Sequence, residues 1–361
     1  MARMDRYNKT TPSNRNSNNQ SNKPKRKKKK KILRIIVLTL VFCLLFAVGA
    51  GGFYLANTFG KIKTHIIDRT KEGTGIDTDT EQKIDEVGGE DIVNIALLGI
   101  DKQEKDDPGR SDSTMIVSID KKDKKIKMIS VMRDSYVKID GHGRDKLNHA
   151  HAYGGPQLTI KTLNQNFGLN IKDFVSVDFG NMADIVDALG GIDINIKADE
   201  LSEKNPYNIN FYIREISGIK KVSKVPTVTK TGMQHLNGIQ AVAYSRIRST
   251  GDGDFDRTER QREVLTQLFN KIKSAGVLKL PGLANKLMGY VSTSMDSGQM
   301  IALGTDVLKS GLNIEQERFP QDGYCQGKTI NGTWYLQYDE TATKNQIFDY
   351  IFKDVKPAPK K

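Results

Sequence analysis

The chain has 361 residues and a formal net charge of +13, a balance that would suit a nucleic-acid-binding protein. The distribution of the charge argues against that class, because residues 1–34 contain 13 of the lysines and arginines and one acidic residue. The other residues are close to neutral, and a tail with almost no apolar side chains cannot bury enough surface to fold. We therefore expect a disordered basic cytoplasmic tail at 1–34 and no nucleic-acid partner.

A membrane anchor is expected directly after this tail. No charged residue occurs between 35 and 60, and residues 35–56 are almost all apolar. A helix of this length spans a bilayer core of about 30 Å, whereas the apolar run of a cleaved signal peptide has only about 7–15 residues. The basic run at 25–31 predicts a cytoplasmic N-terminus and can contact anionic membrane lipid. The sequence thus predicts a single-pass cell-membrane protein with a transmembrane helix at 35–59 and an extracellular remainder.

Cysteine usage is consistent with this topology. Cys43 falls in the expected span and Cys325 is the only other cysteine, so no disulfide is expected within the chain. An exported domain without disulfides is unusual for an animal cell surface. The pattern favours a bacterium with a single membrane and an exposed wall.

The exported part divides into three regions. Residues 60–90 carry many charges and no sustained apolar period, which predicts a polar extracellular stalk. The folded domain is expected at 91–354, long enough for one core. Residues 355–361 are expected to fray.

Hydrophobic periodicity and turn residues predict the elements of this domain. In chain order we expect a strand at 92–98, strands at 114–119 and 126–132, a helix at 156–167, a strand at 174–179, a helix at 182–189, a strand at 192–196, helices at 240–244, 257–274, 281–290 and 301–308, a strand at 333–338 and a helix at 344–352. Strands that alternate with helices indicate an α/β domain in which helices flank a central mixed sheet.

Charged residues occur where several of these strands end or begin. Asp101 follows the first strand, and Gly99 just before it allows a close backbone approach. The other candidates precede the second strand, follow the third, or lie between 244 and 262: Arg110, Asp112, Arg133, Asp134, Arg246, Arg248, Arg257 and Gln261. Because ligands of open α/β sheets bind just beyond strand ends, we expect these residues to share one rim.

The residue types in this set suit a metal–pyrophosphate site. A guanidinium group binds phosphate oxygens in a bidentate manner and stays charged at any working pH. Arg246 and Arg248 are two residues apart, so they share a face of an extended segment. Asp101 and Asp112 would hold Mg²⁺ or Mn²⁺, because Mg²⁺ takes a few carboxylates together with phosphate oxygens. The alternative is that the arginines and carboxylates only form surface ion pairs.

The order and spacing of these segments resemble the signature of the LytR-CpsA-Psr family of Gram-positive cell envelopes. The similar segments are 98–101 (LGID), 110–112 (RSD), 133–134 (RD), 146–155 (KLNHAHAYGG), 186–193 (VDALGGID) and 244–261, which begins YSRIR. The likeness covers about residues 91–267. One departure is Met132, where the family usually has a proline before the arginine.

The resemblance implies a phosphotransferase that moves a glycopolymer, of the teichoic acid or capsular type, from a polyprenyl-pyrophosphate carrier to peptidoglycan. The family fold would hold the lipid tail in an apolar pocket beside the sheet. By matching positions, Asp101 and Asp112 would bind the metal, and Asp134 could act as the base. The remaining residues would contact the pyrophosphate or the substrate: Arg110, Arg133, Lys146, Asn148, Arg246, Arg248, Arg257 and Gln261.

Two other functions are compatible with the same residues. A pyrophosphatase would act on the same lipid with water in place of the sugar hydroxyl. A lipid-carrier-binding envelope regulator, of the kind often labelled a transcriptional attenuator, would bind without chemistry. The sequence does not name the glycopolymer.

Overall fold

The computed structural model describes residues 63–102, 107–275, 286–309 and 313–360. The expected basic tail and the expected transmembrane helix at 35–59 lie outside these residues. Among the helices that the structure does describe, none is both long and apolar enough to cross a membrane.

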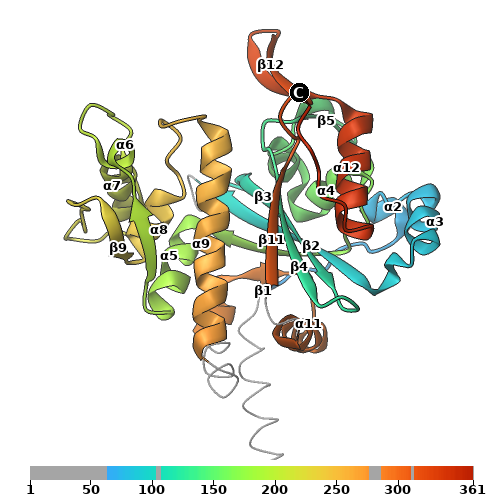
Figure 1. Cartoon of the computed structure of the whole chain (residues 1–361), viewed down its shortest axis with the longest axis horizontal. Coiled ribbons are helices and arrows are strands. Elements are labelled where there is room, and N and C mark those ends of the chain that lie inside the picture. Colours follow the sequence, from blue (N-terminus) through green and yellow to red (C-terminus); the bar gives the residue numbers. More distant parts are fainter. Residues whose placement is uncertain (1–62, 103–106, 276–285, 310–312, 361) are drawn as a thin grey trace, which may run out of the picture. The chain divides into compact units, whose positions relative to one another are not determined.

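A seven-stranded mixed sheet forms the centre of the described domain (Figure 1). Its strands run in the order β1-β10-β7-β2-β3-β4-β11, and the pairs β2–β7, β4–β11 and β1–β10 are parallel. The strands are β1 (Lys63–Thr64), β2 (Ile92–Asp101), β3 (Arg110–Asp120), β4 (Lys125–Val131), β7 (Asp173–Asp178), β10 (Ser292–Thr293) and β11 (Asn313–Phe319). The central strands are largely buried on both faces, as expected for a sheet that is covered twice.

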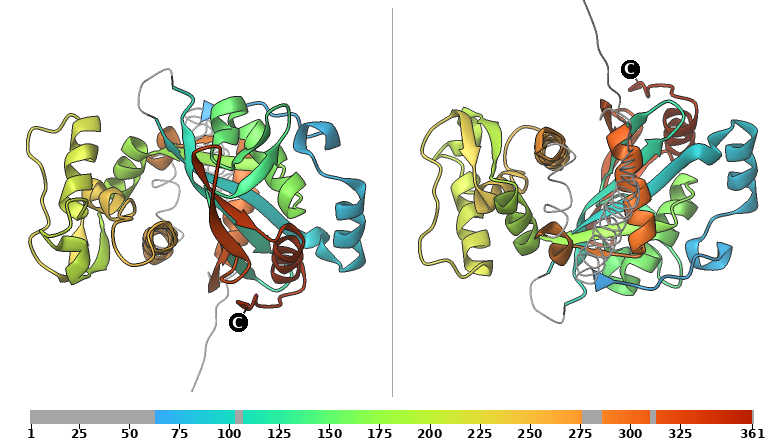
Figure 2. Two further views of the ribbon diagram at one scale, coloured as in Figure 1. Left: turned by 90° about the horizontal axis from the view of Figure 1, so that it is seen from above. Right: turned by 90° about the horizontal axis from the view of Figure 1, so that it is seen from below.

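Helices cover both faces of this sheet (Figures 1 and 2). On one face, α4 (His149–Phe167) and α12 (Glu340–Phe352) pack on side chains such as Ile116 and Ile129. On the other face, α11 (Ser297–Lys309) packs on Val117 and Ile119. The helices α5 (Phe179–Ala188) and α9 (Asp254–Ala275) also contact strands of the sheet. The predicted α/β fold, with a central mixed sheet flanked by helices, is confirmed.

A smaller lobe projects beyond α5, at the left of both views in Figure 2. It contains β8 (Ile192–Ile196), α6 (Ala198–Leu201), α7 (Ile209–Ile219), β9 (Gly232–Leu236) and α8 (Gly238–Tyr244). Buried side chains of these elements form a second hydrophobic cluster, which also includes Val264 and Leu268 of α9. Helix α9 therefore joins the lobe to the sheet.

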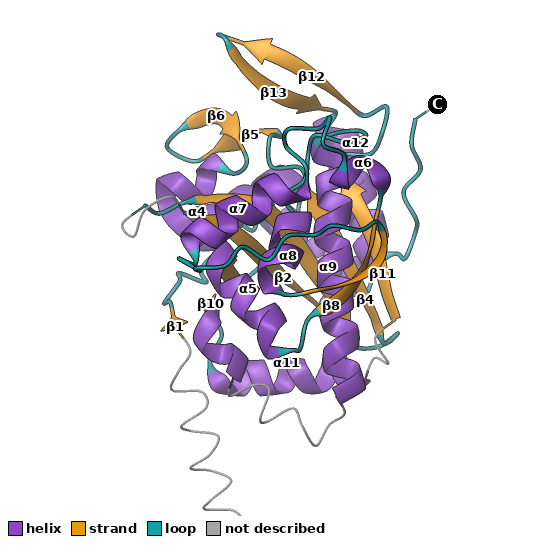
Figure 3. Ribbon diagram, turned by 90° about the vertical axis from the view of Figure 1, so that its left-hand side faces the viewer, coloured by secondary structure: helices purple, strands orange, loops and turns teal. Residues whose placement is uncertain are grey.

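Two hairpins lie beyond the sheet edge. They are formed by β5 (Tyr136–Ile139) with β6 (Gly143–Lys146), and by β12 (Cys325–Ile330) with β13 (Thr333–Tyr338). Figure 3 shows the β12–β13 hairpin extending away from the domain. The strands β5, β6, β9, β11 and β12 and the helices α6 and α7 were not predicted from the sequence.

The expected polar stalk at 60–90 is wrong for the residues from 63 onward. They form α2 (Lys71–Thr74), α3 (Thr78–Glu86) and the short helix η1 (Gly89–Asp91). Ile67 and Ile84 are buried in the main hydrophobic cluster, so the fold begins well before Asp91. These apolar residues are widely spaced among charged ones, and no helical period was recognised from the sequence.

The expected fraying of residues 355–361 is also not seen for the described part of that tail. The Lys360 backbone N–H donates to the Asp322 carbonyl at 2.9 Å, and its ammonium lies 5.9 Å from the centre of the Tyr324 ring. The predicted helix at 281–290 lies partly outside the described residues; within them, Met288–Tyr290 form a short 3₁₀ helix, η3.

Candidate active site

Sheet topology brings three of the predicted segments to one edge. Strand β3 is antiparallel to both β2 and β4, so the end of β2, the start of β3 and the end of β4 meet there. Asp101 ends β2, Arg110 begins β3, and Arg133 follows β4. At a β-bulge beside Asp101, a Cβ on Gly99 would come within 2.9 Å of the Ser113 Cβ. Glycine therefore fits at this crowded position, and the close approach of a ligand to its backbone stays a prediction.

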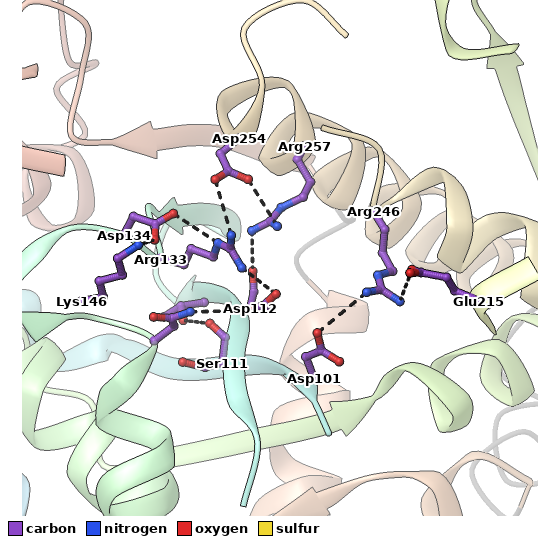
Figure 4. A network of polar contacts seen from close by, with 12 residues as sticks. Asp101, Ser111, Asp112, Arg133, Asp134, Lys146, Glu215, Arg246, Asp254 and Arg257 are labelled. Atoms are coloured by element: carbon purple, nitrogen blue, oxygen red, sulfur yellow. Dashed lines mark hydrogen bonds and ion pairs between the residues drawn. The ribbon is translucent and has the colours of Figure 1, made fainter. Parts of the chain in front are cut away.

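Arg133 lies at the centre of a charged network (Figure 4). Its guanidinium nitrogens are 2.7 Å from Asp112 Oδ2, 3.3 Å from Asp134 Oδ2 and 3.7 Å from Asp254 Oδ2. Burial lowers the pKa of Arg133, but the Asp112, Asp134 and Asp254 carboxylates outweigh burial and raise it above its ordinary value. Arg133 is therefore held in one orientation by charge-assisted contacts.

Arg257, from the first turn of α9, enters the same network from the opposite side. Its guanidinium donates to the Asp112 carbonyl at 3.1 Å and lies 3.3 Å from Asp254 Oδ1. The side chain is buried, and burial together with the positive charge of Arg133 lowers the pKa of Arg257. A buried and a half-buried guanidinium that share the Asp254 carboxylate favour an anion between or beside them.

Three further polar residues belong to this network: Asp134, Lys146 and Asn148. The Lys146 ammonium is 2.7 Å from Asp134 Oδ1, and Asn148 Nδ2 donates to Asp112 Oδ1 at 3.2 Å. Burial raises the pKa of the Asp134 carboxyl, but Arg133 and Lys146 outweigh burial and hold it below its usual value. These three residues orient the network, and none of them lines the cavity described below.

Arg246 approaches from the segment that follows α8. Its guanidinium lies 3.8 Å from Asp101 Oδ2 and 3.5 Å from Glu215 Oε2 of α7. The same group stacks over the Phe179 and Tyr212 rings, at 4.5 and 5.6 Å from their centres. Cation–π contacts of this kind fix the plane of the guanidinium while leaving its N–H groups available to a ligand.

The pKa values of the two carboxylates predicted to hold a metal are shifted in opposite directions. Burial raises the pKa of Asp112, but Arg133 and Arg257 outweigh it and the net pKa is lowered. Burial raises the pKa of Asp101 as well; Arg246 opposes this, Asp112 and Glu215 reinforce it, and the net pKa is raised. The mutual repulsion of Asp101 and Asp112 would be relieved by a cation between them.

These residues fit a divalent ion that takes its other ligands from a substrate. No cluster of three or more His, Cys, Asp or Glu side chains in the described ranges could hold a metal alone. Mg²⁺ needs only one or two carboxylates when phosphate oxygens and water complete its shell. In addition, the buried Asn148 Oδ1 beside Asp112 accepts no hydrogen bond from the described residues.

A cavity of about 1000 Å³ opens over this network. Eight of the predicted site residues line it: Asp101, Arg110, Asp112, Arg133, Arg246, Arg248, Arg257 and Gln261. Arg110 and Arg248 are exposed, and no ion pair joins either of them to another described residue. Their positive charge is therefore available to a ligand.

An apolar cavity of about 220 Å³ adjoins the charged one. It lies between the sheet, through residues such as Leu97 and Val175, and the apolar faces of α5 and α9. Phe179 and Gln261 line both cavities, and Arg246 stacks on Phe179 where they meet. An amphiphile with an apolar tail and an anionic head matches this pair of cavities.

Several residues of the site were not selected from the sequence. Asp254 pairs with both Arg133 and Arg257, and Glu215 pairs with Arg246. The aromatic wall of the charged cavity comes from the lobe: Tyr207, Phe211 and Tyr212. Asp254 stood within a recognised segment, whereas the residues of α7 offered no signal beyond helical periodicity.

Comparison with known proteins agrees with this geometry. Teichoic acid transferase TagT of Bacillus subtilis (strain 168), named as a polyisoprenyl-teichoic acid–peptidoglycan transferase, is 38% identical over 190 residues, which are 52% of this chain and 54% of TagT. The chain thus aligns with about half the length of that relative. The regulatory protein MsrR of Staphylococcus aureus (strain COL) is 32% identical over 267 residues, covering 73% of this chain and 75% of MsrR.

A solved structure of TagT (YwtF) with bound octaprenyl pyrophosphate lipid shares the fold. Its TM-score is 0.53 at 27% identity, with 73% of this chain and 91% of that chain covered. The LytR_cpsA_psr family model matches residues 53–349, most of the sequence. The protein therefore belongs to the LytR-CpsA-Psr family.

Proposed function

We propose that this protein is a phosphotransferase that moves a glycopolymer, of the teichoic acid or capsular type, from a polyprenyl-pyrophosphate carrier to a hydroxyl of peptidoglycan. One observation carries the proposal: a cavity rich in arginine adjoins an apolar cavity, and Phe179 and Gln261 line both. The name of TagT as a teichoic acid transferase, and the octaprenyl pyrophosphate lipid bound to it, support this assignment.

The two cavities divide the donor between them. The polyprenyl chain occupies the apolar cavity beside α9, and its pyrophosphate reaches Arg246 at the junction. Arg133 and Arg257 then face the pyrophosphate from the sheet side, while the exposed Arg110 and Arg248 contact its outer oxygens. The glycan extends toward solvent.

In the reaction, the acceptor hydroxyl oxygen attacks the phosphorus that bears the glycan and forms a new P–O bond. The bond from that phosphorus to the bridging oxygen breaks, polyprenyl phosphate leaves with the electron pair, and the hydroxyl proton passes to water. Negative charge grows on the leaving phosphate, where preoriented guanidinium groups stabilise it. Mg²⁺ or Mn²⁺ held by Asp101 and Asp112 would supply further neutralisation of the pyrophosphate charge.

For Asp134 we propose a positioning role in place of the base suggested by the sequence. Its carboxylate is paired with Arg133 and Lys146, its pKa is lowered, and it does not line the cavity. Asp134→Asn should reduce the rate by about tenfold and leave the pH profile of kcat/KM in place. Loss of the acidic limb of that profile would restore the base assignment.

The decisive experiment incubates the full-length protein in detergent with a polyprenyl-pyrophosphate-linked glycan and peptidoglycan oligomers, followed by mass spectrometry. We expect a peptidoglycan product that carries the glycan through a phosphodiester. Free glycan phosphate without the conjugate would indicate a pyrophosphatase. Bound but unchanged donor would indicate a non-enzymatic envelope regulator, the class suggested by the name of MsrR.

A further inference from the structure

A group of aromatic side chains lies beside the charged cavity and takes no part in the contacts described above. Trp334 and Tyr153 are each 46% exposed, which is high for such large rings. Tyr335 and Tyr136 are half-buried and pack on one another with ring centres 4.7 Å apart. These four residues, from β13, β5 and the first turns of α4, are called the aromatic platform below.

Strand β13 is fixed next to the active-site network by its backbone. The Leu336 N–H donates to the Asp134 carbonyl at 2.9 Å, and Leu336 forms a bridge with Ser135. The Lys146 ammonium, which contacts Asp134, lies 5.8 Å from the centre of the Trp334 ring and 5.9 Å from that of Tyr335. Figure 4 shows Lys146, Asp134 and Arg133 in a row. Two ion pairs, Lys146–Asp134 and Asp134–Arg133, therefore separate the platform from the charged cavity.

The platform also reaches the cavity through α4. Tyr153 directly follows Ala152, which lines the cavity. The Tyr153 hydroxyl donates to Asp145 Oδ2 at 2.6 Å, and His149 Nδ1 lies 2.8 Å from the same oxygen. Polar groups of Asp145, His149 and Lys146 are therefore interleaved with the exposed rings.

This combination matches the chemistry of a carbohydrate. A pyranose ring presents an apolar C–H face, which stacks on an aromatic ring, and a rim of polar substituents, which need donors and acceptors. A lipid tail would not need the interleaved charges, and the apolar cavity already accommodates one. The projecting β12–β13 hairpin extends the surface in one direction, which suits a linear chain of sugars (Figure 3).

We propose that the aromatic platform binds the glycan strand of the acceptor, a linear amino-sugar polymer, and presents one of its hydroxyls to the charged cavity. The proposal rests on the phosphotransferase function above and assigns the acceptor side of that site. Stacking on Trp334, Tyr335 and Tyr153 holds the sugar rings, and Lys146 couples an occupied platform to Asp134 and Arg133.

The sequence provides a specific probe, because Trp334 is the only tryptophan in the chain. Full-length protein in detergent micelles is titrated with peptide-free glycan fragments of peptidoglycan, and tryptophan emission is followed. We expect a saturable change in emission. Tyr335→Ala and Tyr153→Ala should each weaken binding by about tenfold, and Tyr335→Phe should bind nearly as the wild type does. Met233→Ala, which removes an exposed apolar side chain of the lobe, is the control and should have no effect.

A second set of measurements separates this inference from the proposed function. With the same alanine variants, KM for the acceptor should rise about tenfold, while the affinity for polyprenyl pyrophosphate stays unchanged. If wild-type protein transfers glycan but the fragments never alter Trp334 emission, the platform assignment is wrong and the phosphotransferase function stands. If the fragments saturate Trp334 but no transfer occurs, the platform is a glycan site and the phosphotransferase function fails.

Discussion

At the scale of single residues, the arginines of the site fall into two groups with different consequences for stability. Arg133 and Arg257 are held by Asp112 and Asp254, so removing either leaves a carboxylate in a partly buried place without its partner. Arg248 is exposed and has no ion pair among the described residues. A loss of activity is therefore easiest to interpret at Arg248 and at Arg246, which is only loosely paired.

The pair Arg246 and Arg248 tests the pyrophosphate clamp. Each single change to alanine should reduce phosphotransfer by about 10²–10³, the usual cost of removing one transition-state donor. The double variant should lose less than the product of the two single losses, because both groups act on one transition state. Lysine should rescue Arg246 poorly, because an ammonium lacks the planar fork that stacks on Phe179.

The matched control for this prediction is Arg214→Ala. Arg214 is an exposed arginine of α7, one residue before Glu215, and it does not line the cavity. Its removal should leave the rate and the melting temperature unchanged. Strict multiplicativity of the Arg246 and Arg248 losses, measured by initial rates, would mean that the two side chains do not share a substrate group.

Asp101 gives a prediction in which stability and activity change in opposite directions. Its pKa is raised in the folded state, so the ionised carboxylate costs stability at any pH above that pKa. Asp101→Asn should therefore melt at a higher temperature than the wild type at pH 7, with the difference vanishing as the pH falls below about 4. The same variant should lose phosphotransfer. We expect Mg²⁺ to raise the melting temperature of the wild type but not that of Asp101→Asn.

Thermal unfolding from pH 3 to 8, with and without Mg²⁺, checks this prediction. A wild type that is indifferent to Mg²⁺ and fully active in excess chelator would remove the metal from Asp101 and Asp112. A lower melting temperature of Asp101→Asn at pH 7 would instead mean that the carboxylate stabilises the fold through Arg246.

Many of the charged residues that line the cavity could be predicted from the sequence, because they lie at the ends of strands that apolar runs mark. Asp101, Asp112 and Arg133 follow or precede apolar runs that are β2, β3 and β4 in the structure. Asp134 was equally conspicuous, yet its side chain pairs with Lys146 behind the cavity. A sequence shows which residue ends a strand, but the direction of its side chain depends on partners that are distant in the chain.

At the scale of elements, helix α9 lines both the charged cavity and the apolar cavity. Its N-terminal turns carry Arg257 and Gln261 at the charged cavity. One helical face further along, with Val264, Leu265 and Leu268, lines the apolar cavity. The spacing of four between Gln261 and Leu265 keeps both on the same side of the helix. A polyprenyl pyrophosphate can thus be bound along a single rigid element.

Filling the apolar cavity should separate tail binding from head-group binding. Leu265→Trp adds volume on the face of α9 that lines this cavity, so affinity for polyprenyl pyrophosphate should fall at least about tenfold. Affinity for inorganic pyrophosphate should be unchanged, because Arg246 and Arg257 remain in place. The control is Asn270→Trp, an exposed position of the same helix. Equal losses for both ligands, measured by calorimetry, would contradict a tail-binding role for the cavity.

The elements missed from the sequence have identifiable causes. Strand β11 reads NIEQERF and has charged side chains because it pairs only with β4 at the sheet edge, so no apolar run marks it. Helix α7 buries Ile209, Ile213 and Ile216 at a helical spacing, but polar residues surround this short apolar period in the sequence. The short strands β1 and β10 have two residues each and form only because the sheet is already there.

At the scale of the whole domain, the charged cavity is a tertiary feature that no local pattern specifies. Its floor comes from the sheet edge, and its aromatic wall comes from Tyr207, Phe211 and Tyr212 of the lobe. These parts are about 100 residues apart in the sequence, and α9 brings them together. The motifs predicted which charged residues line the cavity, but its aromatic wall and the neighbouring aromatic platform are defined only by the three-dimensional structure.

The proposed function also requires the domain to lie on a particular side of the membrane. The proposed acceptor is wall peptidoglycan, so the domain has to lie outside the membrane while its lipid-linked donor stays within reach. The sequence meets both needs with an apolar stretch at 35–59, preceded by a basic run at 25–31 that predicts a cytoplasmic N-terminus. Residues 60–91, 32 in number, separate this stretch from the start of β2.

Protease added to intact, wall-stripped cells tests this arrangement. An epitope at the N-terminus should survive on a short fragment, because residues 1–34 are predicted to be cytoplasmic and the span to be embedded. An epitope after Lys361 should be lost, since the domain that carries it would be exposed to the medium. After detergent lysis both epitopes should be lost, which shows that the tail is protected by the membrane and not by folding. A C-terminal epitope that survives in intact cells would place the domain in the cytoplasm, where no peptidoglycan acceptor exists, and would contradict the proposed function together with the topology.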